Sequence, residues 1–298
     1  MFTRVLFPTD FSAYANAVFT CLPELKAAGM REVILLGVGR PEDIPLGPAF
    51  QAETIDKVRW SAEEALHVAQ MALENQGLRV TTRVEFGSPP EEIVRVAQEE
   101  HVDLIMMGAQ GKTLAQELLL GSVAQEVVRR ATTPVLIQKF HVVRELGHVE
   151  CRRVCANMFT RVLHPTDFSD CANAAFQLVK RLKNAGTKEV VILHVQDERA
   201  MRHRPAEQLA AFDREDQERL EAMSRALVLF GLQARPLLRH GIPFRETLKV
   251  AEEEHPCLIV LGSHGRSAVQ EMLAGSTFEN VVRLSHHPVL VVRREATA

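Results

Sequence analysis

The chain has 298 residues, 46% of them hydrophobic, and a formal net charge of −3 from 35 Lys and Arg against 38 Asp and Glu. Because the cations are interspersed with the acids, we expect no nucleic-acid binding. No apolar run approaches the roughly 18 residues of a membrane span, and the apolar start is too short for a secretion signal. We therefore expect a cytoplasmic protein that binds no membrane, with room for two domains of about 150 residues.

Strands and helices alternate through the first half of the chain. Short apolar runs ended by turn residues predict strands, and apolar positions at helical spacing predict helices. The expected strands lie at 5–7, 33–38, 80–86, 104–107 and 134–137. The expected helices lie at 12–28 with Ser12 as N-cap, about 52–76, from Pro89 to near His101, and 122–130, and residues 108–120 form a loop with some helical character.

The second half repeats this order. Residues 1–12, MFTRVLFPTDFS, return as residues 158–169, MFTRVLHPTDFS. The corresponding strands are expected near Val162, Val190, Ala234, Leu258 and Val289. Such alternation predicts an α/β protein with an open parallel sheet in each copy and helices on both of its faces. We therefore predict two tandem domains of one fold, residues 1–140 and 158–298, joined by a linker at 141–157.

The linker holds a candidate metal site. His141, His148, Cys151 and Cys155 could bind a zinc ion, although their spacing matches none of the usual zinc patterns. The alternative is a short linker helix that carries these side chains without a metal. The odd number of cysteines, 5, in a chain expected to be intracellular predicts free thiols.

A spaced glycine pattern follows the fourth strand of each copy. Gly108 and Gly111 are followed after nine residues by Gly121 and Ser122, and Gly262, Gly265, Gly275 and Ser276 repeat the pattern. Glycine lets backbone amides approach a phosphate closely, and a helix N-terminus favours an anion. Ser122 either donates to a phosphate or caps its own helix, because Ser122 with Gln125 fits a capping box. Ligands of open α/β sheets bind at the carboxyl ends of the strands, where this pattern falls.

This pattern resembles the nucleotide-binding motif of the universal stress protein family, G-2x-G-9x-G-S/T, and the sequence is identified as a tandem member with one family domain per copy. The resemblance implies two five-stranded parallel sheets of order 3-2-1-4-5, and ATP (or AMP or ADP) with Mg²⁺ in the crevice. The residues it implies for nucleotide binding are Pro8, Thr9, Asp10, Val38, Met107, Gly108, Gly111, Gly121, Ser122, Val123, Pro165, Thr166, Asp167, Val195, Leu261, Gly262, Gly265, Gly275, Ser276 and Thr277, and we add Lys112 and Arg266 as candidates beside the motif.

By this resemblance, Asp10 and a backbone group at Val38 hold the adenine side, as do Asp167 and Val195, while the glycines and serines take ribose and phosphates. Asp10 has an alternative role as a helix cap. Lys112 and Arg266 are not part of the motif, and each either adds charge near the phosphates or is a solvated cation.

Neither copy shows a nucleophile–base pair, so we name no catalytic residue and expect an ATP-binding regulatory or adaptor protein of the stress response with slow or no hydrolysis. One alternative is a weak ATPase or phosphotransfer enzyme that uses Asp10 or Glu117, and another is a nucleotide-free interaction protein. The family usually pairs domains through their last strands, here residues 134–137 and 288–292. We expect such pairing within the chain, with a homodimer as a further option, and protein partners that the sequence does not name.

Overall fold

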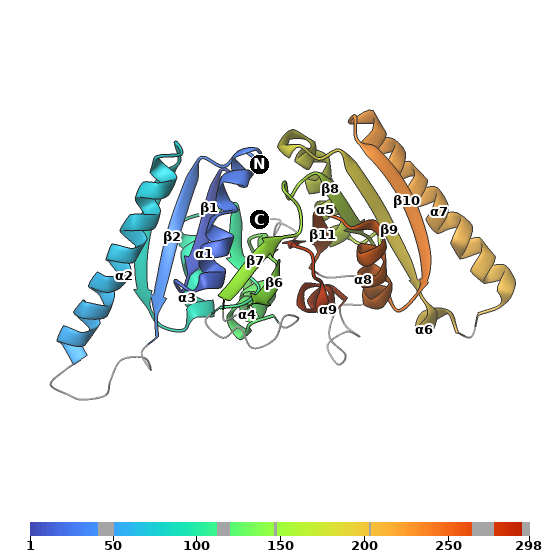
Figure 1. Cartoon of the computed structure of the whole chain (residues 1–298). Coiled ribbons are helices and arrows are strands. Elements are labelled where there is room, and N and C mark those ends of the chain that lie inside the picture. The colour runs from blue at the N-terminus through green and yellow to red at the C-terminus, as the bar shows by residue number, and fades with distance from the viewer. Residues whose placement is uncertain (41–50, 112–119, 146–147, 203, 264–276, 294–298) are drawn as a thin grey trace. The chain divides into compact units, whose positions relative to one another are not determined.

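The structure is a computed structural model that describes residues 1–40, 51–111, 120–145, 148–202, 204–263 and 277–293 (Figure 1). Its contacts divide the chain into two compact units, Met1–Gln138 and Lys139–Ala298. We call them the first and second unit. Among the described helices, none is both long enough and apolar enough to cross a bilayer.

The first unit is built on a parallel sheet. Its strands are β1 (Arg4–Thr9), β2 (Glu32–Gly39), β3 (Arg79–Phe86), β4 (Leu104–Gly108) and β5 (Val135–Gln138). They lie in the order β3-β2-β1-β4-β5, and each neighbouring pair runs parallel. Central residues such as Leu6, Ile34 and Ile105 are fully buried, as expected for a sheet covered on both faces. The predicted order 3-2-1-4-5 is confirmed.

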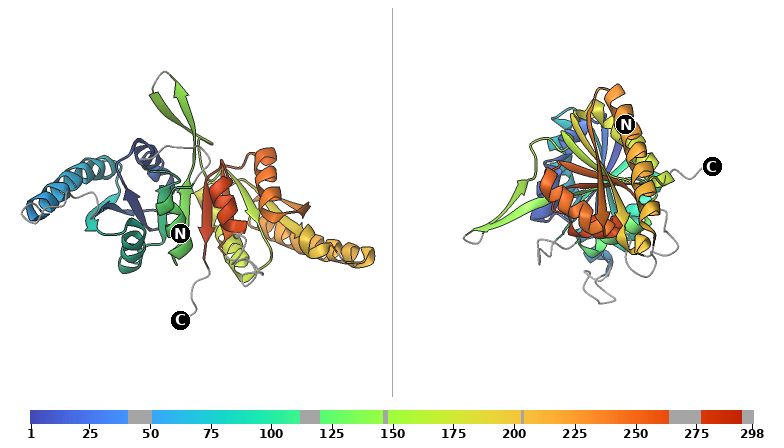
Figure 2. Two further views of the ribbon diagram at one scale, coloured as in Figure 1. Left: turned by 90° about the horizontal axis from the view of Figure 1, so that it is seen from below. Right: turned by 90° about the vertical axis from the view of Figure 1, so that its right-hand side faces the viewer.

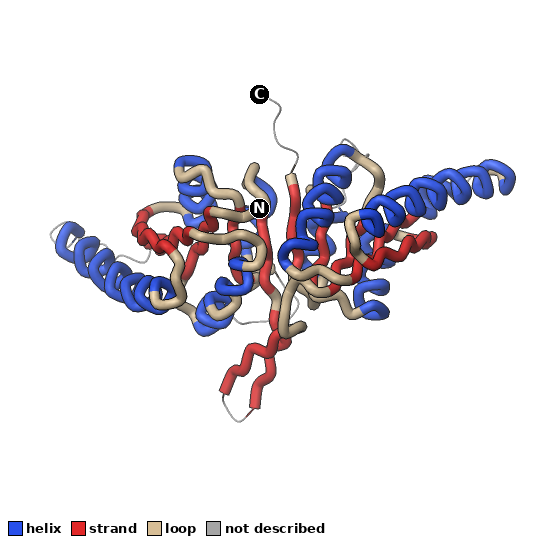
Figure 3. The backbone as a smooth tube through the Cα atoms, turned by 90° about the horizontal axis from the view of Figure 1, so that it is seen from above, coloured by secondary structure: helices blue, strands red, loops and turns tan. Residues whose placement is uncertain are grey.

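Helices lie on both sides of the strands in each unit (Figure 3). Those of the first unit are α1 (Ala13–Phe19), α2 (Gln51–Glu74), α3 (Pro89–Glu99) and α4 (Ser122–Arg130), with a 3₁₀ helix, η1, at Leu22–Lys26. Glycines with positive φ follow two of these segments, Gly29 after η1 at 97° and Gly77 after α2 at 78°. Glycine adopts this left-handed conformation at little cost, so both stops agree with the sequence.

The expected helix at 12–28 is wrong in its second half. α1 ends at Phe19, and η1 continues the chain with Pro23 near its start. Proline lacks the N–H that an α-helix needs and disfavours helical backbone at the residue before it. The second copy has Lys180 at the matching position, and there α5 runs unbroken from Asp170 to Leu182. The proline therefore explains the break.

The second unit repeats the architecture. Its parallel sheet has the order β10-β9-β8-β11-β12. The strands are β8 (Arg161–Pro165), β9 (Glu189–Asp197), β10 (Gln233–Gly241), β11 (Leu258–Gly262) and β12 (Val289–Val292). The helices are α5 (Asp170–Leu182), α6 (Glu198–Met201), α7 (Ala206–Leu229), α8 (Pro243–Glu254) and α9 (Thr277–Leu284), with a 3₁₀ turn, η3, at Lys183–Ala185.

One core pair differs between the copies. In the first unit the rings of Phe7 and Phe19 pack with their centroids 6.0 Å apart. In the second unit His164 stacks on Phe176 at 5.8 Å. His164 is fully buried, and its Nδ1 donates to the carbonyl of Val260 over 2.8 Å. The histidine thus replaces a phenylalanine in an otherwise equivalent core.

The expected linker helix is also wrong. A hairpin of two antiparallel strands, β6 (Phe140–Glu145) and β7 (His148–Arg153), stands here. The hairpin is a separate two-stranded sheet that projects from the layers of the second unit (Figure 2). Its strands are rich in β-branched residues, among them Val142, Val143 and Val149, which favour strands over helices.

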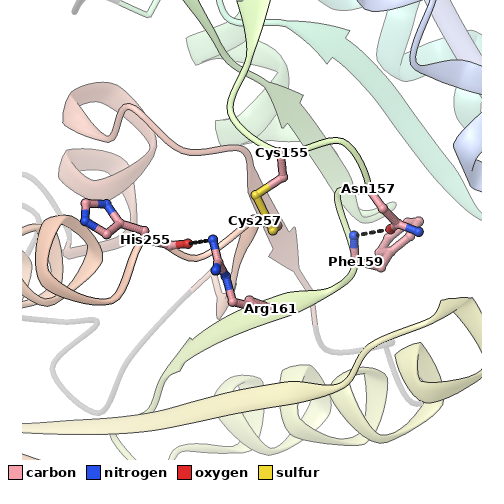
Figure 4. Close-up of a disulfide and its surroundings, with 6 residues drawn as sticks. All are labelled: Cys155, Asn157, Phe159, Arg161, His255 and Cys257. Atoms are coloured by element: carbon pink, nitrogen blue, oxygen red, sulfur yellow. Dashed lines mark hydrogen bonds between the residues drawn. A yellow bond between two sulfur atoms is a disulfide. The ribbon is translucent and has the colours of Figure 1, made fainter.

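Cys155 and Cys257 form a disulfide with a Cα–Cα distance of 5.5 Å (Figure 4). The expectation of free thiols is therefore wrong for these two residues, while Cys21 and Cys171 are not bridged. The bridge removes Cys155 from the candidate zinc set, and the side chains of the other three members lie outside the described part. Within the residues that the structure describes, no group of three or more His, Cys, Asp or Glu side chains could hold a metal ion.

The first unit shows why Cys257 is available for a bridge. Its counterpart, Asp103, accepts hydrogen bonds from the backbone N–H groups of Thr3 and Arg4 over 2.7 and 2.9 Å. In the second unit Asn157 precedes the strand instead, and its side chain accepts from the N–H of Phe159 over 2.9 Å. Cys257 has no such role and reaches Cys155, which fastens the chain after the hairpin to the start of β11.

Candidate functional site

A pocket of about 880 Å³ lies at the carboxyl ends of the strands in the first unit. It is lined by every expected site residue of this unit that the structure describes. These are Pro8, Thr9, Asp10, Val38, Met107, Gly108, Gly111, Gly121, Ser122 and Val123. Lys112 and Glu117 lie outside the described residues. Four separate segments of the chain thus meet in one pocket of the size typical of small-molecule sites.

The turn after β1 forms one edge of this pocket. The Thr9 hydroxyl accepts a hydrogen bond from the Phe11 N–H over 3.0 Å, and Asp10 Oδ1 accepts from the Ser12 N–H over 3.0 Å. Ser12 in turn caps α1 by accepting from the Ala15 N–H over 3.1 Å. Asp10 is therefore not the helix cap, and its carboxylate instead holds the turn at the pocket.

The backbone of this turn is strained in both copies. Phe11 has a φ of 58° and Phe168 one of 61°. Bulky side chains rarely adopt this left-handed region, which costs about 1–2 kcal/mol per residue. In the second unit Thr166 and Asp167 make the same two hydrogen bonds, each of 3.0 Å. Retained strain of this kind is concentrated at functional sites, which supports a ligand role for the turn.

The first glycine of each motif is needed for packing. A Cβ at Gly108 would lie 2.8 Å from the ring of Tyr14 on α1. A Cβ at Gly262 would lie 2.7 Å from the backbone of Cys171 on α5. These glycines therefore let the helix after the first strand approach β4 or β11, a structural role that the motif alone did not indicate.

The second glycine brings the loop after β4 to Asp10. A Cβ at Gly111 would lie 2.6 Å from Asp10 Oδ2. Real Cβ atoms do not approach an oxygen this closely, so only glycine fits here without a shift. The carboxylate of the β1 turn and the backbone of the glycine loop thus lie in contact at the pocket.

The N-terminus of α4 closes the same pocket. Gly121 is the N-cap, because its carbonyl accepts the first helical hydrogen bond, from the Gln125 N–H over 2.9 Å. Of the two roles considered for Ser122, capping is therefore excluded, and this exposed serine is the first helical residue. The unpaired first N–H groups and the positive dipole end of a helix favour an anion.

The second unit has a pocket of about 510 Å³ at the matching place. Among the expected residues it is lined by Pro165, Thr166, Asp167, Val195, Leu261, Gly262 and Thr277. Gly265, Arg266, Gly275 and Ser276 lie outside the described residues.

A hydrogen-bonded group centred on His194 occupies one end of the second pocket. His194 Nδ1 donates to the Thr166 carbonyl over 2.7 Å, and its Nε2 lies 3.3 Å from Asp216 Oδ2. The Gln196 amide donates to the same Asp216 oxygen over 2.9 Å. The Phe168 ring packs on His194 with centroids 4.6 Å apart.

Sequence reasoning missed the contribution of α7 to this pocket. Phe212, Glu215, Asp216 and Arg219 all line it from one side of the helix. Their spacing of three and four residues marks one helical face, so the signal was present. What the sequence could not show was that this face borders the pocket.

Two parallel sheets of order 3-2-1-4-5, each with a pocket at the carboxyl ends of its strands, define a doubly wound α/β protein with a crevice-type ligand site. The universal stress protein family matches residues 1–139 and 158–293. The chain belongs to this family, and the match recurs once in each half.

Known relatives and solved structures agree with this family assignment. A universal stress protein of Methanocaldococcus jannaschii is 34% identical over 157 residues, which cover 46% of this chain and 97% of the relative. The crystal structure of a universal stress protein from Archaeoglobus fulgidus matches with a TM-score of 0.74 at 28% identity, covering 98% of this chain and 96% of that one. A structure from Pseudomonas aeruginosa, with a TM-score of 0.64 at 16% identity and coverage of 98% and 93%, shares the fold.

Proposed function

We propose that the chain is an ATP-binding regulatory or adaptor protein of the stress response with slow or no hydrolysis. The supporting observation is that Asp10, Val38 and the motif residues Gly111, Gly121 and Ser122 line one pocket. In this proposal Asp10 and the Val38 backbone hold the base and ribose side. The glycine loop and the start of α4 bind the phosphates, where backbone amides meet the anion without a Cβ between them.

The residues present fit an adenine nucleotide. Gly111 leaves no room for a Cβ beside the Asp10 carboxylate, so the carboxylate lies directly against the backbone of a motif glycine. A bound Mg²⁺ ion would supply charge neutralisation on the phosphates. The chain's own contribution is to position the nucleotide between the β1 turn and the α4 N-terminus.

Slow or absent turnover is supported by the described lining of the first pocket. Asp10 is the only carboxylate among those residues, and the Ser12 N–H already binds it. Hydrolysis would require a base placed to activate water. Glu117 lies outside the described residues and is the residue to test for such a role.

The test has two parts. Mass spectrometry of nucleotide released from the denatured protein, with calorimetric titration of the stripped protein by MgATP, is expected to give binding with the adenine nucleotide. No nucleotide and no heat of binding would instead favour a nucleotide-free interaction protein. Single-turnover hydrolysis is expected to be slow, whereas rapid turnover abolished by Glu117→Gln would favour an ATPase.

We propose a cytoplasmic protein that pairs its two domains within the chain through their last strands and acts on protein partners, with a homodimer as a further form. Fractionation of cells and sedimentation equilibrium of the purified chain test these points, and a membrane-associated protein would contradict the first.

A further inference from the structure

The two pockets carry opposite charges at matching positions. Two residues after Val38 the first unit has Arg40, and two residues after Val195 the second unit has Asp197. Each lines its own pocket. Asp197 accepts hydrogen bonds from Arg199 that lower the pKa of this carboxyl, so it is charged at neutral pH. This charge reversal lies at the end of the pocket where the base of a nucleotide is expected.

The helix that borders the base end of each pocket, α2 or α7, also differs in charge between the two units. In the first unit α2 contributes Lys57 and the small residues Ser61, Ala62 and Ala65. Counting from Gly77 and Gly231, which follow the two helices, the matching residues on α7 are Ala211, Glu215, Asp216 and Arg219. At these four positions the first pocket has one cation and three small residues, whereas the second has one alanine, two acids and one arginine.

The strand beneath carries smaller residues in the first pocket. Gly37 and Gly39 occupy the positions of His194 and Gln196, the two side chains that bind Asp216. A Cβ at Gly37 would have its nearest neighbours at 3.7 and 3.8 Å, which is ordinary contact, so the first unit has no polar side chain where the second has two.

An aromatic ring borders the same end of the first pocket. The ring of Phe86 packs directly on Gly39, within 2.7 Å of where a Cβ would be, and the Arg59 guanidinium lies 5.0 Å from the ring centroid. In the second unit the pair is His240 with Asp213, joined by a 2.9 Å contact. The base end of the first pocket thus combines an apolar ring with nearby positive charge.

A nucleotide seated as proposed leaves this region unused. Its phosphates would lie at Gly111 and Ser122 and its base at Val38, while Arg40, Lys57 and Phe86 line the pocket beyond Val38. Positive charge at both ends suits a ligand with an anionic group at both ends, and a carboxylate pairs well with an arginine.

We propose that the first pocket binds an adenine nucleotide whose base carries a carboxylate-bearing substituent, and that Arg40 and Lys57 recognise this carboxylate. The second pocket lacks both cations, because Asp197 and Ala211 stand at the matching positions, so it offers no equivalent recognition of the carboxylate. This inference rests on the proposed nucleotide site and adds its specificity.

Calorimetry follows binding to the first pocket. The stripped full-length protein is titrated with ATP, N6-carboxymethyl-ATP and N6-(2-aminoethyl)-ATP, with Mg²⁺ present. Asp167→Ala removes the carboxylate that holds the turn at the second pocket, so the same titrations of this variant report the first pocket alone.

The carboxymethyl analogue is expected to bind the first pocket roughly threefold to tenfold more tightly than ATP, the range of one or two solvent-exposed ion pairs, with the advantage reduced in high salt. Arg40→Asp should remove or reverse this preference while changing ATP affinity less than about threefold. Arg31→Asp makes the same charge change at an exposed residue before the other end of β2 and should leave the preference intact.

Equal affinity for the carboxymethyl and aminoethyl analogues, or a preference unchanged in Arg40→Asp, would overturn this inference while ATP binding upheld the nucleotide site. Failure of all three nucleotides to bind would overturn both proposals. Binding of the carboxymethyl analogue alone would support the inference and show that unmodified ATP is not the ligand.

Discussion

Gly111→Ala tests the contact on which the proposed site depends. A methyl carbon at this position would lie 2.6 Å from Asp10 Oδ2, whereas ordinary contact begins at 3.4 Å. The backbone of Gly111 does not have a positive φ, so alanine adds no conformational strain there. The carboxylate or the loop must therefore move by roughly 0.8 Å, which is enough to disturb an aligned hydrogen bond.

The expected loss follows from the group that moves. A hydrogen bond to a charged group contributes about 1.5–3 kcal/mol. Loss of the one proposed between Asp10 and the nucleotide would raise the dissociation constant of MgATP roughly tenfold to hundredfold. Isothermal titration of the stripped protein measures it. Binding of MgATP to Gly111→Ala within threefold of the parent protein would refute the reasoning.

The stability of the second unit should respond to changes at three positions. Burial lowers the pKa of His164 from 6.5 to about 4, so the unfolded chain binds the proton more readily and about 3 kcal/mol of stability in the second unit should be lost as pH falls from 6.5 to 4. His164→Phe should remove this pH dependence, measured as the free energy of unfolding from urea titrations at pH 7 and 4.5. If the variant lost as much stability between these two pH values as the parent protein, the dependence would belong to other groups. Cys155→Ser opens a bridge across a sequence separation of 102 and should destabilise the second unit by about 4 kcal/mol. Thermal unfolding with and without reductant measures this loss. An unchanged unfolding temperature of the second unit would contradict the bridge. Lys180→Pro should shorten α5 and cost about 3 kcal/mol or more, seen as lost helical circular dichroism, and an intact helix would mean that Pro23 is not what ends α1.

Local chemistry explains which parts of the fold the sequence predicts. Apolar runs such as Val5–Phe7 end in turn residues that fix where a strand stops, and Gly29 and Gly77 stop what precedes them through their positive φ. The strand order needed the family resemblance, because periodicity describes each element without its neighbours. The motif residues could be named from spacing, since each copy repeats them.

The three wrong predictions have different causes. The break before Pro23 is local and follows from proline's missing N–H. The bridge of Cys155 to Cys257 spans a sequence separation of 102, and only the folded chain brings the two cysteines together. Ser122 loses its expected capping role because the backbone of Gly121 turns one residue earlier, a shift within the uncertainty of any helix boundary read from sequence.

One interacting pair has changed at both of its positions between the two halves. Arg59 with Phe86 in the first corresponds to Asp213 with His240 in the second. A chimera that moved Asp213 alone into the first half would place an acid against a phenyl ring, and one that moved His240 alone would place an imidazole beside a guanidinium. The effects of grafting these two residues will therefore be non-additive, and both are best exchanged at once.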